Sequence, residues 1–203
     1  MNTINFIKKW KIKYTINKLN KFGIKHNKEL MFSPQLLWLD LFEESNCFQI
    51  NKDVLEKIVF QISTHLNLQT NFSLDIKIDN SKDCGDSKSQ EILPINIKND
   101  TIHIFLIHSN CFFNIGEQAF IALLCRELTR YYLENMKFKI KSDYQIEIAM
   151  CWLGICKEAH LLLDGVITCY YIDGKIKKNN LFACNYNELL FAREICLANL
   201  CDI

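Results

Sequence analysis

The feature that most constrains this chain is a pair of charges inside an apolar helix. From Ala119 to Leu133, apolar residues occur around almost the whole circumference of an expected helix, which is typical of a helix enclosed by protein. Arg126 and Arg130 lie one turn apart on a stripe that is apolar before and after them. Because a buried charge is costly without a partner, the pattern predicts acidic partners for these arginines elsewhere in the fold.

The remaining periodicities predict the other elements. Hydrophobic spacing predicts helices over residues 6–19, 54–66, 117–134 and 143–163, one that opens at Ser33-Pro34, and a last one from Asn187 to Leu200. Strict alternation predicts a strand over residues 73–79. Two further short strands flank Lys98-Asn99-Asp100, which is a hairpin turn sequence. Helices, then a small antiparallel sheet, then packed helices indicate an α+β fold.

Composition limits the class of protein. A chain of 203 residues with 49% hydrophobic residues is long and apolar enough for one folded domain. No stretch reaches the roughly 18 uncharged apolar residues of a membrane span. Ten cysteines lie mostly in apolar runs, and no apolar leader precedes them. We therefore expect free thiols and a cytoplasmic location.

The charge is unevenly distributed. Residues 1–30 contain eight lysines and one acid, Glu29, giving +7; because the whole chain carries +1, the rest carries −6. This division predicts a basic helical arm over residues 1–30 and one α+β domain over residues 31–203. With Phe6, Trp10 and Tyr14 among the lysines, residues 1–28 suit nucleic acid or an anionic membrane surface. The alternative is an amphipathic helix that covers its own domain.

A resemblance to zincin metallopeptidases starts from Arg126-Glu127-Leu128-Thr129-Arg130. The segment is similar to the zincin helix His-Glu-x-x-His, in which two histidines bind zinc and the glutamate activates water. Residues 146–155 resemble the Thr-Asp-Leu-Ala-x-x-Tyr-x-Gly-x segment of an uncharacterised bacterial zincin-like family, and residues 187–192 resemble its closing helix. The resemblance runs from Ser33 to the C-terminus. It implies a zincin-like α+β fold, with a small sheet on two long central helices plus flanking helices.

The chain departs from that family at both metal positions. Arginine offers no lone pair to a metal, so we expect no zincin-type metal site, no cofactor and no zincin-type hydrolysis. Glu147 lies where the resemblance would put a third, acidic ligand. The remnant motif Arg126, Glu127, Arg130 and Glu147 would then form a buried ionic cluster in place of zinc. The alternative is that both arginines are surface residues paired with Glu127 or Glu134.

Two other groups are candidate sites. Cys156 and His160 share a helix face near Glu158, and with Cys125 they would make a relocated metal site or a Cys/His nucleophile pair; a core cysteine beside a helix histidine is the simpler interpretation. His103 and His108 differ by an odd number of strand positions, so they face opposite sides of a strand and cannot bind one ion.

Three functions follow from these features. The first is a catalytically inactive zincin-like domain that binds a protein partner or regulates one. The second is an enzyme with a remodelled site, in which Glu127 acts as a base and Arg126 and Arg130 bind an anionic substrate. The third is attachment to nucleic acid or to an anionic membrane surface through residues 1–28.

Overall fold

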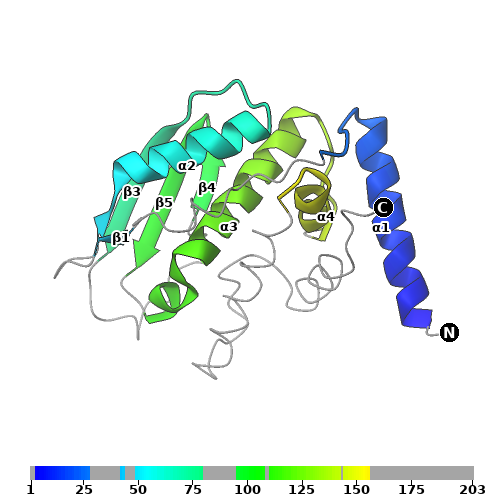
Figure 1. The fold of residues 1–203 in the computed structure, drawn as a ribbon, viewed down its shortest axis with the longest axis horizontal. Helices are drawn as coiled ribbons and strands as arrows, with labels where there is room; N and C mark the ends of the chain where they lie inside the picture. The colour runs from blue at the N-terminus through cyan, green and yellow to red at the C-terminus, as the bar shows by residue number, and fades with distance from the viewer. Residues whose placement is uncertain are drawn as a thin grey trace.

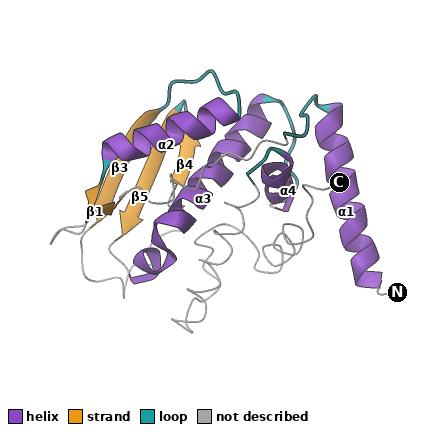
Figure 2. Cartoon of the chain, in the orientation of Figure 1, coloured by secondary structure: helices purple, strands orange, loops and turns teal. Residues whose placement is uncertain are grey.

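The computed structural model describes residues 3–27, 42–43, 49–79, 95–107, 110–142 and 144–155. Its helices are α1 (Thr3–Lys21), α2 (Lys52–His65), α3 (Asn110–Asn135) and α4 (Tyr144–Trp152). Its main sheet contains β3 (Ser73–Asp79), β4 (Ile95–Lys98) and β5 (Thr101–Ile107), and β1 (Phe42–Glu43) pairs with β2 (Gln49–Ile50) in a separate ladder. Helices packed with a small sheet make the described fold α+β (Figure 2).

The sheet has the order β3-β5-β4 and is mixed, so the expectation of an antiparallel sheet is wrong. β4 and β5 form the predicted antiparallel hairpin, in which Asn99 and Asp100 have φ of 49° and 57°, as a two-residue type I′ turn requires. β3 lies along the other edge of β5 and runs parallel to it. This register aligns Leu74 with Ile102, so apolar residues of the two strands share one face of the sheet.

Each of the four described helices contributes side chains to one core, and so does the main sheet. α3 packs against α2, α4 and β4, and it crosses the molecule diagonally in Figure 1. The side chain of Asn51 caps α2 by accepting a hydrogen bond from the backbone N–H of Val54, as the sequence predicts. The buried apolar residues of the core include Leu55, Ile58 and Ile62 of α2, Ile95, Ile102 and Ile104 of the sheet, Leu124 and Leu128 of α3, and Ile146 and Ile148 of α4.

The basic helix α1 is docked on this core through α4 (Figure 1). α1 ends before Gly23, whose φ of 76° lets the backbone N–H of Ile24 bond back to the carbonyl of Leu19. Leu19 and Ile24 are fully buried. The indole Nε1 of Trp152 donates to the carbonyl of Ile24 at 3.1 Å, which ties the end of α1 to the end of α4.

Two helix boundaries differ from the sequence expectation. α3 begins at Asn110 rather than Glu117, so Gly116 lies within the helix, where glycine is tolerated at a cost of about 1 kcal/mol. α4 ends at Trp152, before the end expected at Leu163. Gly154 has φ of 82°, and the N–H of Ile155 bonds to the carbonyl of Met150, which closes the helix as a Schellman motif.

Some expected elements lie outside the described residues. These are the helix that opens at Ser33-Pro34 and the one from Asn187 to Leu200. Within the described part of the chain, none of the helices combines the length and apolarity that crossing a membrane requires.

Candidate functional site: a buried ionic cluster

Arg126 lies in the middle of α3 and points into the protein. Its side chain is only 1% exposed and is the largest fully buried side chain among the described residues. Its Nε donates to Oε1 of Glu147 at 2.7 Å, and its Nη1 donates to Oε1 of Glu127 at 3.0 Å. The apolar stripe of α3 therefore carries a buried guanidinium with two carboxylate partners, as the sequence predicts for this residue.

Arg130, one turn further along α3, lies at the edge of the same group. Its Nε is 3.2 Å from Oε2 of Glu127, and its side chain is 29% exposed whereas that of Glu127 is 6% exposed. The expectation that both arginines point inward is therefore confirmed for Arg126, whereas Arg130 is only partly buried. Arg126 is not the surface residue of the alternative interpretation, although Arg130 does pair with Glu127 as that interpretation proposed. We call Arg126, Glu127, Arg130 and Glu147 the ionic cluster.

Glu147 enters the cluster from α4. It lies in the first turn of this helix, where the positive end of the helix dipole stabilises a carboxylate. Almost every residue of α4 is buried, because the helix is packed by α3 on one side and by α1 on another. The side chain of Gln145 accepts a hydrogen bond from the backbone N–H of Lys141 and fixes the entry to the helix. Glu147 is thereby held 1% exposed against Arg126.

The cluster is electrically balanced. Two guanidinium groups face two carboxylates, which is the arrangement that makes a set of buried charges tolerable. Guanidinium groups only donate hydrogen bonds, so neither arginine can bind a metal ion. Among the described residues, no group of three or more His, Cys, Asp or Glu side chains is placed to hold a metal ion. The contacts that join the four side chains of the cluster are ion pairs and hydrogen bonds.

The other predicted candidates are not brought together in the described part of the chain. Cys125 is buried in α3, and Cys156, Glu158 and His160 lie outside the described residues. His103 is half-exposed on β5, while His108 also lies outside. The candidate site of Cys125, Cys156 and His160 therefore stays a prediction, as does the placement of His103 and His108 on opposite sides of a strand.

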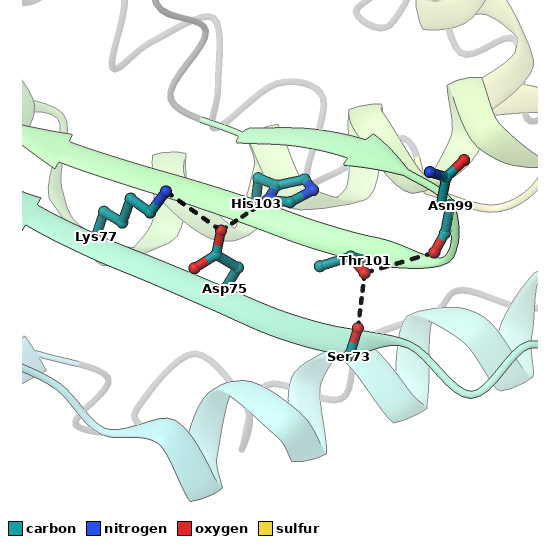
Figure 3. A network of polar contacts seen from close by, with 6 residues as sticks. All are labelled: Ser73, Asp75, Lys77, Asn99, Thr101 and His103. Atoms are coloured by element: carbon teal, nitrogen blue, oxygen red, sulfur yellow. Dashed lines mark hydrogen bonds and ion pairs between the residues drawn. The ribbon is translucent and has the colours of Figure 1, made fainter.

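A polar network on the sheet escaped the sequence analysis (Figure 3). Nδ1 of His103 lies 2.9 Å from Oδ2 of Asp75, and Nζ of Lys77 lies 3.7 Å from the same oxygen. The hydroxyls of Ser73 and Thr101 are hydrogen bonded at 2.8 Å on the same pair of strands. The hydrogen bond with His103 is the main reason that the pKa of Asp75 lies below its usual value. Only the parallel register, which aligns Asp75 with His103, reveals this pair.

Comparisons of the chain with protein-family models, with curated proteins and with solved structures found no match.

Proposed function

We propose that this chain is a catalytically inactive zincin-like domain that acts as a protein-interaction or regulatory module. The observation that carries the proposal is the hydrogen bond from Nε of Arg126 to Oε1 of Glu147 at 2.7 Å. The zincin resemblance assigns a zinc-binding histidine to the first of these positions and an acidic ligand to the second. In this chain an arginine that cannot bind a metal donates directly to one oxygen of that carboxylate.

Charge balance supports the same proposal. In the zincin arrangement, a divalent cation between two neutral histidines faces the two carboxylates. Here two guanidinium groups supply the same total of positive charge to Glu127 and Glu147. The cluster then acts as a brace between α3 and α4, which leaves the surface of the domain as the part that meets a partner.

The remodelled enzyme has weaker support. It needs Glu127 to take a proton from a substrate, yet Glu127 is 6% exposed and both of its carboxylate oxygens face arginines. Only Arg130, at 29% exposed, is within reach of an anion from solvent. Titration with phosphate, followed by NMR of the guanidinium groups, separates the two proposals: a saturating response at Arg130 with release of Glu127 favours the enzyme.

Metal analysis of the purified full chain tests the loss of the zincin site. We expect no stoichiometric zinc and an unchanged melting temperature in the presence of a chelator, because removal of a structural zinc lowers stability directly. Tightly bound stoichiometric metal would overturn the proposal.

The interaction role needs a separate test. We expect affinity capture from native cells, after chemical crosslinking, to recover a specific protein at a stoichiometric level. The matched bait is the same chain unfolded by heat, which exposes apolar surface but lacks the native surface. Recovery of the same proteins by folded and unfolded baits would contradict a specific partner.

A further inference from the structure

The helix α1 has two faces of different character. Its inner face carries Thr15 and Leu19, both fully buried against the core. Its outer face carries Trp10 and Tyr14, which are 59% and 43% exposed. Their rings stack on each other with centroids 5.5 Å apart and planes 19° from parallel. The opposite face of this helix already packs on the core. An exposed pair of large aromatic side chains on the outer face therefore indicates a binding surface.

The charged side chains of α1 itself all have the same sign. α1 contains six lysines and no acidic residue. Lys13 and Lys21 are exposed, and the helical period places them on the same outward side as Trp10 and Tyr14. A partner for this face must therefore tolerate apolar rings and carry negative charge.

Positive charge continues from α1 onto the segment that joins α3 to α4. Nζ of Lys18 donates to the backbone carbonyl of Lys139 at 2.7 Å and lies 4.0 Å from the centre of the Phe138 ring. Burial, and then the positive charges of Lys141 and Lys139, hold the pKa of Lys18 below its usual value. Both of those neighbouring lysines are exposed, so the basic surface spans two elements that are distant in sequence.

We propose that the outer face of α1 binds an anionic membrane surface. Trp10 and Tyr14 enter the interfacial region of the bilayer, where amphipathic rings are favoured. The flanking lysines, including Lys13 and Lys21, reach the lipid phosphates with their long side chains. The helix lies on the membrane and the domain stays outside it. The inference is independent of the ionic cluster and of the function proposed for it.

The ring geometry favours a bilayer over single-stranded nucleic acid. Proteins that bind single strands stack successive bases on open aromatic faces along a basic groove. Trp10 and Tyr14 instead cover one face of each other, and they stand on the convex surface of a helix. A lipid interface accepts the edges and outer faces of such a pair and needs no free face between them.

Point substitutions on the full chain give the sharpest test. Deleting the arm would also remove Leu19 and Ile24 from the core, so loss of binding would be confounded with loss of fold. We expect the protein to co-sediment with vesicles of equal parts phosphatidylglycerol and phosphatidylcholine, and not with phosphatidylcholine alone. The tryptophan emission should shift to the blue on binding, and Trp10→Phe should abolish most of that shift.

Charge and aromatic variants then locate the surface. Lys13→Gln with Lys21→Gln should lower the partition coefficient roughly 30-fold, from the usual contribution of a lysine near an anionic bilayer. Its matched control removes two exposed lysines elsewhere, Lys57→Gln with Lys98→Gln, and should leave partitioning unchanged. Trp10→Ala with Tyr14→Ala should also weaken binding, whereas Phe60→Ala, which removes a ring 71% exposed on α2, should not.

Three results would overturn the proposal. The first is no binding to anionic vesicles by a protein whose circular dichroism shows it to be folded. The second is equal loss of binding in the outer-face variants and their controls. The third is tight binding of a fluorescent single-stranded oligonucleotide, measured by anisotropy, that depends on Trp10 and Tyr14 while vesicles are not bound. The last outcome assigns the same surface to nucleic acid.

Discussion

At the residue scale, Glu147 is the group on which the ionic cluster depends, because its Oε1 accepts from the most deeply buried arginine. We predict that Glu147→Ala lowers the free energy of unfolding by roughly 3–5 kcal/mol, the cost of leaving a buried charge without its partner. Urea denaturation followed by circular dichroism measures the loss.

The control for this prediction is Glu134→Ala, which removes an exposed carboxylate near the end of α3. A surface substitution of this kind changes stability within about 0.5 kcal/mol. If Glu147→Ala cost no more than about 1 kcal/mol, the pair would behave as a surface salt bridge, and the brace between α3 and α4 would not exist.

The Asp75–His103 pair gives a prediction about pH. A carboxyl group whose pKa is lowered by folding stabilises the fold above its unfolded pKa, and this contribution is lost as pH falls through the folded pKa. Because the hydrogen bond with His103 is the largest cause, His103→Ala should raise the pKa of Asp75 toward its usual value. NMR titration of the side-chain carboxyl carbon of Asp75 measures this pKa directly.

Lys77→Gln is the comparison variant, because attraction to Lys77 contributes less to the same shift than the hydrogen bond does. It should raise the pKa of Asp75 by a smaller amount than His103→Ala. An equal or larger effect at Lys77 would mean that the ion pair at 3.7 Å, and not the histidine, holds the carboxylate.

At the scale of elements, substitution of Gly23 tests how the end of α1 is held, because this residue has a left-handed backbone conformation. Gly23 has φ of 76°, and a Cβ placed there would meet no atom within 4 Å. Gly23→Ala should therefore cost about 1–2 kcal/mol from backbone strain alone. Gly23→Asn should cost less, since asparagine tolerates this conformation. Equal stability of glycine and alanine, measured by thermal unfolding, would show that the cap does not hold α1 on the core.

Local sequence patterns predicted the position of strands and turns well, but they did not predict how the strands pair. The alternation of residues 73–79 gives β3 with its observed bounds, and the turn at Asn99 and Asp100 gives the hairpin. The same alternation holds for either strand direction, so it cannot tell that β3 lies parallel to β5. Gly116 and Gly154 differ only in context: one lies inside α3 and the other ends α4. Glycine adopts both the helical conformation and the left-handed one. The sequence therefore placed the start of α3 too late and the end of α4 too far along the chain.

The candidate site was predictable where helical spacing applied. Arg126 and Arg130 were placed on one stripe by their separation, and the resemblance placed Glu147 beside them; the structure brings all of these residues into contact with Glu127 or with Arg126. The unequal exposure of the two arginines was not predictable, because it depends on what packs over the last turns of α3. The Asp75–His103 pair depends on strand pairing, which no local signal contains.

At the scale of the whole molecule, α4 connects the cluster to the basic helix. Its first turn supplies Glu147 to α3, and Trp152 at its end donates to the carbonyl of Ile24 after α1. The geometry that holds the ionic cluster therefore depends on packing along α3, α4 and α1 together. A test of this arrangement should change the chemistry at Arg126 and Arg130 and leave the packing in place.

Replacing Arg126 and Arg130 by histidine is that test, and we predict that the double variant binds zinc with weak, micromolar-range affinity. The two positions have the spacing that lets two imidazoles reach one ion, and Glu147 would supply a third ligand. Charge is conserved, since zinc restores the positive charge that the guanidinium groups lose. We expect low affinity because zinc-binding histidines need acceptors that fix their tautomers, and a chain without the metal has no need to keep such acceptors. Calorimetry should show binding by the double variant and its loss on adding Glu147→Gln; equal binding by both, or none by either while the fold stays intact, would mean that α3 and α4 share with zincins only a short motif.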